Sequence, residues 1–301
     1  MAPADAPTLR IAGATVEVRS SLLMGVVNAS LDSFSDGGRY RTVEDRVALA
    51  GRLVAEGAAI VDVGGQSLIR GEPELAPEAE ISLVVPVIEG VARRWPDVWI
   101  SVDTYKPPVA EAALAAGAHL VNDVSGLRHP EMASVCARAG ASLVIAHMDG
   151  RPKELLAAPV RYDDIVEAVH RALRAKLDQA VAMGVDPEAI VLDPGPDLAK
   201  TPAQTVALLR RVDDLRDLGR PLLLPLSRKD FLGAILQRRP LGRDAGTLAA
   251  VALAAVVPGN IFRVHDVGAA ADVVAVVDAL TGRVELPPDY WLPPELRREP
   301  R

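Results

Sequence analysis

The sequence predicts one closed (β/α)₈ barrel, or TIM barrel, in which eight parallel strands alternate with helices. A short β-branched run followed by a longer amphipathic segment recurs eight times in the 301 residues. Strands that alternate with helices need crossover connections, so the predicted sheet is parallel. Eight units in a single chain favour a closed barrel, with an open doubly wound sheet as the structural alternative.

The predicted strands are short runs rich in Val, Ile and Leu. They span Ser21–Asn28, Ala59–Gly64, Trp99–Thr104, His119–Asp123, Ser142–His147, Ile190–Asp193, Leu222–Ser227 and Ile261–His265. The predicted helices carry apolar residues at helical spacing. They span Val43–Glu56, Glu78–Arg93, Pro108–Ala116, Glu131–Ala139, Ile165–Met183, Pro202–Leu218 and Thr247–Val257. Several of them end in glycine, the residue that most readily terminates a helix.

The periodic pattern covers one domain, residues 1–283, and leaves both ends of the chain outside it. Residues 1–8 are rich in Pro and Ala, and we expect them to be disordered. Residues 284–301 form a proline-rich tail. We expect either an extended strap anchored by Tyr290 and Trp291 or a partly ordered tail.

Composition excludes several classes of partner. Half of the residues are apolar and only 3% are aromatic, so the core must be aliphatic. The formal charge of −7 argues against nucleic acid, whose phosphates select basic surfaces. The longest apolar run, 267–280, contains two aspartates and is too short to span a membrane. A single cysteine, Cys136, and an N-terminus without a signal peptide predict a cytoplasmic protein.

Polar side chains stand at the end of every predicted strand. They are Asn28, Asp62, Asp103, Asn122, Asp123, His147, Asp193, Ser227, Arg228, Lys229, Arg263 and His265. Each has a structural alternative as a helix cap, a turn residue or a core histidine. Because the C-terminal strand ends of a barrel converge on one mouth, the set together predicts a binding site.

The segment after the first strand, NASLDSFSDGGRY, is long and polar and carries Asp32 and Asp36, as functional lids do. MGVVNASLDSFSDGG resembles the signature of dihydropteroate synthases. The resemblance continues in order through DVGGQS, ISVDT, NDVSGLRHPEM, AHMDG, LDPG…K, LSRKDF, GTLAAVALA and RVHDV. It therefore extends over almost the whole barrel.

The resemblance implies a transferase of folate synthesis that couples a pterin methyl pyrophosphate to p-aminobenzoate and releases pyrophosphate. The family's pterin-binding positions match Asp103, Asn122, Asp193 and Lys229 here. The chemistry agrees, because an ionised Asp accepts paired N–H donors such as those of an aminopyrimidinone.

The same resemblance implies how the pyrophosphate is held. It places Asn28 on Mg²⁺, the expected cofactor, and Arg263 and His265 on the phosphates. Asp36 would face the pterin cation left by C–O cleavage. The catalytic set implied is thus Asp36, Lys229, Arg263 and His265. Asp32 is expected to organise the lid.

The acceptor subsite departs from the family pattern. The second loop reads GGQSLIRG where the family has GGESTRPG, so Leu68 and Ile69 replace Thr and Arg. Leu198 stands where an aromatic residue packs on the benzoate ring, and Asp230 replaces a serine that helps hold its carboxylate. An anion at 230 would repel another anion. A capping box formed by Ser227 and Asp230 is the structural alternative.

Three functions remain open at this point. One is a dihydropteroate synthase-like transferase with a degraded p-aminobenzoate subsite. Another is a non-catalytic or low-activity pterin-binding paralogue, like the divergent second copy in some actinobacteria. A methyltransferase-type barrel is disfavoured by the phosphate-binding residues. By analogy with the family, we expect a homodimer.

Overall fold

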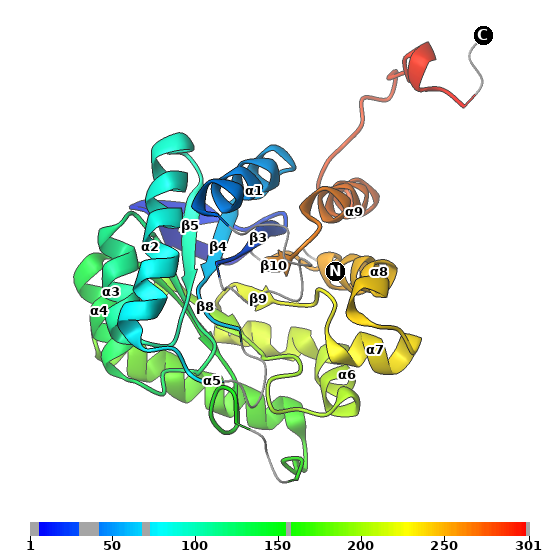
Figure 1. The fold of residues 1–301 in the computed structure, drawn as a ribbon. Helices are drawn as coiled ribbons and strands as arrows, with labels where there is room; N and C mark the ends of the chain where they lie inside the picture. Colours follow the sequence, from blue (N-terminus) through cyan, green and yellow to red (C-terminus); the bar gives the residue numbers. More distant parts are fainter. Residues whose placement is uncertain (1–5, 30–41, 68–72, 155–157, 299–301) are drawn as a thin grey trace.

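The computed structural model describes residues 6–29, 42–67, 73–154 and 158–298, and it closes eight parallel strands into a barrel (Figure 1). The barrel order is β10-β3-β4-β5-β6-β7-β8-β9, which confirms the predicted barrel and excludes the open sheet. The strands are β3 (Leu22–Asn28), β4 (Ile60–Gly64), β5 (Trp99–Asp103), β6 (Leu120–Asp123), β7 (Ser142–Ala146), β8 (Ile190–Asp193), β9 (Leu222–Leu224) and β10 (Asn260–Val264).

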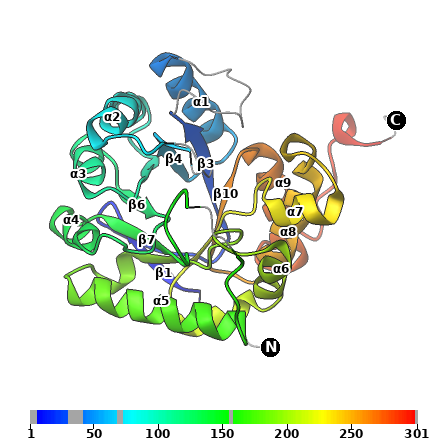
Figure 2. The ribbon, with the colours of Figure 1, turned by 60° about the horizontal axis from the view of Figure 1, so that its bottom comes forward.

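Helices surround the strands (Figure 2). They are α1 (Val43–Ala55), α2 (Pro77–Arg94), α3 (Pro107–Ala115), α4 (Glu131–Ala139), α5 (Ile165–Ala182), α6 (Pro202–Arg210), α7 (Asp230–Leu236), α8 (Asp244–Ala255) and α9 (Val267–Leu280). Short 3₁₀ turns supplement them: η2 (Pro187–Ala189), η3 (Val212–Leu218), η4 (Pro240–Gly242) and η5 (Pro294–Leu296). None of the helices in the described ranges is long and apolar enough to cross a membrane.

The single helix predicted over 202–218 is wrong. The α-helix ends at Arg210, and a 3₁₀ segment follows from Val212. Val212, Leu215 and Leu218 are its buried residues, and they recur at every third position. That spacing matches the three residues per turn of a 3₁₀-helix rather than the 3.6 of an α-helix.

Two strands at the N-terminus were not predicted. β1 (Thr8–Ile11) and β2 (Ala14–Glu17) form an antiparallel hairpin, so the expected disorder of residues 1–8 does not extend to Thr8. Leu9 and Ile11 are fully buried against inward-facing residues near the start of the barrel strands, such as Met24. The hairpin thus covers the N-terminal end of the barrel, opposite the mouth.

The C-terminal tail leaves the barrel after α9 (Figure 1). Tyr290 is 56% exposed and Trp291 is 80% exposed. Of the two alternatives, the strap anchored by Tyr290 and Trp291 is therefore disfavoured, because neither side chain is buried.

Candidate functional site

A cavity of about 600 Å³ opens at the C-terminal ends of the strands. Four segments line it: residues 148–154 after β7, 197–199 after β8, 227–230 after β9, and Arg263 with His265 from β10. We call this space the mouth cavity. Its walls come from the later strands of the barrel, which the sequence places far apart.

Arg263 joins three strands at the floor of the mouth. Its Nε donates to Asp62 Oδ2 over 2.7 Å, and its Nη2 donates to Asp103 Oδ2 over 2.8 Å. Asn122 Nδ2 also donates to Asp62 Oδ2, over 3.3 Å. One cation thus serves two carboxylates, and Arg263 lies beside the predicted pterin-binding residues as well as in the cavity wall.

Two acceptors in this cluster lack partners among the described residues. Asp62 Oδ1 and Asn122 Oδ1 are both buried, and neither accepts a hydrogen bond there. Leaving a buried polar atom unsatisfied costs about 1–3 kcal/mol, so such atoms mark sites where a donor is expected. Their chemistry suits a ligand that offers N–H groups.

The predicted carboxylates titrate well above their ordinary range. Burial raises the pKa of Asp103 to about 7, against the attraction of Arg263. Burial also raises the pKa of Asp193 to about 6, although Asp193 accepts the backbone N–H of Gly195 over 2.7 Å. Both groups can therefore change charge near neutral pH, which is typical of functional sites.

Two lysines stand near Asp193. Burial lowers the pKa of Lys229, while the negative charges of Asp197 and Asp193 oppose that change. Lys200 is buried, and its Nζ donates to the carbonyl oxygens of His147, Gly195 and Leu198 over 2.9–3.2 Å. Lys200 therefore fixes the loop after β8, whereas Lys229 lines the mouth cavity.

Ser227 orients His265. Its Oγ accepts the backbone N–H of His265 at 3.4 Å and lies 2.8 Å from Nδ1. When the hydroxyl proton points to Nδ1, the remaining ring proton sits on Nε2. Burial and nearby cations lower the pKa of His265 to about 3, so the ring is neutral at physiological pH. His265 can donate a hydrogen bond to an anion but brings no positive charge.

Other polar strand ends serve the fold. Asp123 accepts from Ser125 and from the backbone N–H of Leu127, which holds the turn after β6. Arg228 pairs with Asp244 over 2.8 Å. The structural alternative of a turn residue thus holds for Asp123, whereas Arg228 forms an ion pair and also lines the mouth cavity.

The capping box predicted for Ser227 and Asp230 does not form. The helix α7 begins at Asp230 with Lys229 as its N-cap, and no side chain caps it. Asp230 is 83% exposed, and its carboxylate pairs with Arg243 Nη1 over 2.9 Å. Leu198 and Asp230 both line the mouth cavity, as the predicted acceptor subsite requires.

Asp197 is a cavity residue that the sequence analysis did not single out. Its Oδ2 accepts the backbone N–H of Phe231 in α7 over 3.2 Å. Its Oδ1 accepts from the buried Thr205 over 3.0 Å. The family pattern DPGxGFGK has glycine at this position, whereas this chain reads DPGPDLAK, and that substitution was the available signal for Asp197.

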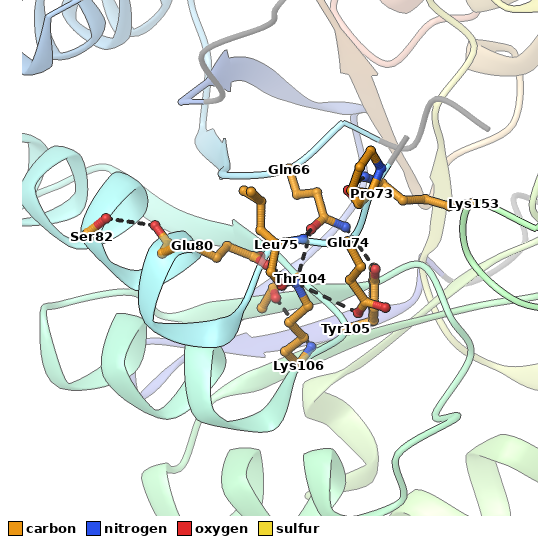
Figure 3. Close-up of polar contacts among 11 residues, drawn as sticks. Gln66, Pro73, Glu74, Leu75, Glu80, Ser82, Thr104, Tyr105, Lys106 and Lys153 are labelled. Carbon is orange, nitrogen blue, oxygen red and sulfur yellow. Dashed lines mark hydrogen bonds and ion pairs between the residues drawn. The ribbon is translucent and has the colours of Figure 1, made fainter. Parts of the chain in front are cut away.

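A polar cluster fixes the end of the second loop (Figure 3). Lys106 Nζ donates to Glu80 Oε2 over 2.7 Å, to Gln66 Oε1 over 3.0 Å and to the Leu75 carbonyl over 2.6 Å. Gln66 Nε2 donates to the Tyr105 hydroxyl over 2.8 Å. Gln66, one of the departures from the family pattern, is thus an anchor for the loop.

Several residues singled out from the sequence lie outside the described residues: Asp32, Asp36, Leu68 and Ile69. Asn28, the predicted magnesium ligand, ends β3 and is half-buried. The described residues contain no group of three or more His, Cys, Asp or Glu side chains arranged to hold a metal.

Comparisons with known proteins agree with this geometry. The model of the family described as "Pterin binding enzyme" matches residues 24–265. The chain is 44% identical to dihydropteroate synthase of Mycobacterium leprae, over 85% of this chain and 92% of that protein. It is 39% identical to "Inactive dihydropteroate synthase 2" of the same organism, over 90% and 94%. A Yersinia pestis dihydropteroate synthase solved with a sulfonamide drug superposes with a TM-score of 0.87 at 34% identity, over 91% and 99%.

Proposed function

The chain belongs to the family of pterin-binding enzymes, as a relative of dihydropteroate synthases, and on this premise we propose what its site does. We propose that it binds 6-hydroxymethyl-dihydropterin pyrophosphate and couples it to an amine acceptor, with release of pyrophosphate. Asp103, Asn122, Asp193 and Lys229 are the proposed pterin-binding residues.

The observation that carries this proposal is the cluster around Arg263. Asp62 and Asn122 hold buried acceptor atoms that a heterocycle with N–H donors would satisfy. Asp103 and Asp193 add carboxylates whose ionised forms would accept further N–H groups. A site for an apolar ligand would not require these buried polar groups.

The pyrophosphate would lie above the cluster, toward the mouth cavity. Arg263 and His265 line that cavity and are the proposed phosphate-binding and catalytic residues, together with Lys229. Departure of pyrophosphate develops negative charge, which preorganised cationic and N–H donors stabilise. Arg263 supplies charge, and neutral His265 supplies a hydrogen bond. Asp36, in the first loop, completes the proposed catalytic set.

Magnesium is the proposed cofactor. Its preferred ligands are oxygen atoms, and it commonly uses one or two side-chain oxygens together with substrate phosphates. The Asn28 side-chain oxygen, at the mouth end of β3, fits such a donor set. When bound, the metal would neutralise charge on the departing pyrophosphate.

A non-catalytic or low-activity pterin-binding paralogue is the second candidate function. Leu198 and Asp230 stand in the acceptor subsite, and a relative at 39% identity is named an inactive synthase. This alternative retains the pterin pocket and loses the acceptor.

Calorimetry and pyrophosphate release test both candidates. We expect the pterin pyrophosphate to bind in the presence of Mg²⁺, and Asp193→Ala to weaken it about a hundredfold, since a charged buried hydrogen bond contributes about 2–3 kcal/mol. Asp217→Ala, an exposed carboxylate on the outer surface, is the matched control. Unchanged affinity in Asp193→Ala would refute the pocket assignment. Binding without pyrophosphate release, with or without p-aminobenzoate, would favour the non-catalytic paralogue.

We further propose a cytoplasmic homodimer. An apolar groove of about 580 Å³ lies between α6, α7 and α8, and Ile235 and Leu253 are among its exposed lining residues. Exposed apolar faces of this kind are typical of interfaces. The only cysteine, Cys136, is buried and unpaired, which is compatible with a reducing compartment.

A further inference from the structure

The loop after β8 keeps a glycine-like backbone without the glycines. Asp197 has a φ of 62° and Ala199 a φ of 54°, both in the left-handed region that favours glycine. Asp tolerates this region better than most residues. A side chain held at such a position in a cavity wall indicates a role for that side chain.

The Asp197 carboxylate bridges two elements at the cavity wall. Oδ1 accepts the hydroxyl proton of Thr205 in α6, and Oδ2 accepts the backbone N–H of Phe231 in the first turn of α7. Thr205 Oγ1 also accepts the Asp197 backbone N–H over 3.0 Å. The carboxylate therefore has a fixed position. It occupies the Phe231 N–H, which would otherwise be available to a bound anion.

The two bonds use both carboxylate oxygens as acceptors. An asparagine would still accept the Phe231 N–H with its oxygen, but its amide could only donate to Thr205 Oγ1, so Thr205 would have to turn its hydroxyl proton to another acceptor. The fold thus accounts for an acceptor at 197, and the negative charge acts on the cavity in addition.

Asp197 is not the only carboxylate at this part of the cavity, although the cations Arg228, Lys229 and Arg263 line the cavity too. Asp230 begins the same turn of α7 and adds a second carboxylate, and Arg243 is already paired with it. The negative charges of Asp197 and Asp193 act on Lys229, the neighbouring cation of the wall. A third carboxylate entering here would meet like charges and no uncommitted backbone donor at Phe231.

We propose that Asp197 determines acceptor specificity by standing where an acceptor's acidic group would bind, so that the acceptor is an amine with a neutral distal end. The inference rests on the proposed function, because it assumes that the acceptor enters beside Leu198 and Asp230. An amine carrying a carboxylate, sulfonate or phosphate at its far end would be excluded, and an uncharged amine of the same shape would be admitted.

Two variants and two matched probes test the proposal. The probes are p-aminobenzoate and its neutral isostere 4-aminobenzamide, titrated by calorimetry into full-length protein saturated with plain hydroxymethyl pterin, pyrophosphate and Mg²⁺, a mixture in which no coupling occurs. Asp197→Asn removes the charge and keeps an acceptor for the Phe231 N–H. Asp197→Gly removes the side chain and relieves the left-handed backbone. Asp217→Asn makes the same charge change at an exposed position outside both the mouth cavity and the apolar groove, and it is the control.

We expect the natural protein and the control to bind the benzamide at least about tenfold more tightly than the benzoate. In Asp197→Asn the affinities for the benzamide and the benzoate should differ by less than threefold, because the benzoate binds more tightly than in the natural protein. We expect the same result for Asp197→Gly. An unchanged preference in both variants, or no benzoate binding by either, would overturn the proposal. Thermal unfolding confirms that each variant is folded. If the natural protein does not bind pterin pyrophosphate, the proposed function is wrong. Failure of the proposed function is thus distinguishable from failure of the Asp197 proposal.

Discussion

Arg263 Nη2 donates to Asp103 Oδ2 over 2.8 Å, and this ion pair joins β10 to β5 beneath the mouth of the barrel. Arg263 also pairs with the fully buried Asp62, so its removal would leave Asp62 and the partly buried Asp103 without their cation. The family resemblance places the same guanidinium on the phosphates. The structure therefore gives Arg263 a place in the fold in addition to its proposed role toward pyrophosphate.

Arg263→Ala should destabilise the protein by about 3–5 kcal/mol, because breaking a buried ion pair leaves an uncompensated charge. It should weaken the pyrophosphate ligand and, to a smaller extent, the plain hydroxymethyl pterin. Chemical denaturation and calorimetry measure the two effects. Arg211→Ala, which removes an exposed ion pair, should cost less than about 1 kcal/mol. A stability loss in Arg263→Ala no larger than that control would show that the cluster does not depend on the cation.

Pterin affinity should rise with pH between 5 and 7. Asp193 has a pKa of about 6, so its carboxyl is mostly protonated at pH 5 and mostly ionised at pH 7. Only the ionised form accepts two N–H donors, and the affinity should therefore increase about tenfold over this range. His265 and His147, with pKa values of about 3 and 4, stay neutral throughout.

The plain hydroxymethyl pterin is the probe for this titration, because it carries no phosphate that titrates. Asp193→Asn should remove this tenfold contribution and leave that of Asp103, whose pKa of about 7 means that its ionised fraction also rises between pH 5 and 7. An identical pH profile in the variant would assign the dependence to another group.

Asp230→Ser should improve p-aminobenzoate binding only modestly. Its carboxylate is 83% exposed and paired with Arg243, so solvent and the ion pair screen its charge. We expect less than about fivefold from this change alone, since exposed charges contribute below about 1 kcal/mol. Adding Leu198→Phe should improve binding further by restoring a stacking surface. Competition with a sulfonamide measures both, and a larger gain from Asp230→Ser than from Asp197→Asn would contradict the order expected from their contacts.

Leu253→Asp should convert the proposed dimer to a monomer. Leu253 is 79% exposed on α8 and lines the apolar groove, where a buried carboxylate would be unpaired in an interface. Light scattering during gel filtration measures the mass. Val181→Asp, on α5 and 37% exposed, should leave the mass unchanged. A monomeric natural protein would refute the homodimer directly.

Most of the fold could be predicted from the sequence because its signal is repeated. Each barrel unit pairs a β-branched run with a helical pattern, and the predicted 131–139 helix coincides with α4. The β1–β2 hairpin could not be predicted in this way, because it belongs to no unit and Pro and Ala precede it. Its turn residues Ala12 and Gly13 both have a positive φ, of 51° and 76°, as a tight hairpin turn requires. Of the two, only the glycine indicates such a turn in the sequence.

The site could be predicted less completely. Their positions at the ends of predicted strands pointed to Asp103, Asn122, Asp193 and Arg263, since a barrel brings the strand ends together independently of which side chains they carry. It could not show that Arg263 bonds Asp62, or that Ser227 bonds His265 instead of capping α7. Those choices depend on which partner lies closer in space. Asp197 was missed because its bond to Phe231 spans 34 residues.

Residues 195, 197 and 199 in the loop after β8 all have a positive φ, but they differ in which side chains they can carry. A Cβ at Gly195 would lie 2.0 Å from the His147 carbonyl oxygen, so that position admits glycine alone. Residues 197 and 199 already carry side chains on the same backbone path. A randomised library at these two positions would vary the lining of the cavity while Gly195 and Lys200 hold the loop in place. We expect such a library to change acceptor preference while the proposed pterin-binding residues Asp103, Asn122 and Lys229 stay unaltered.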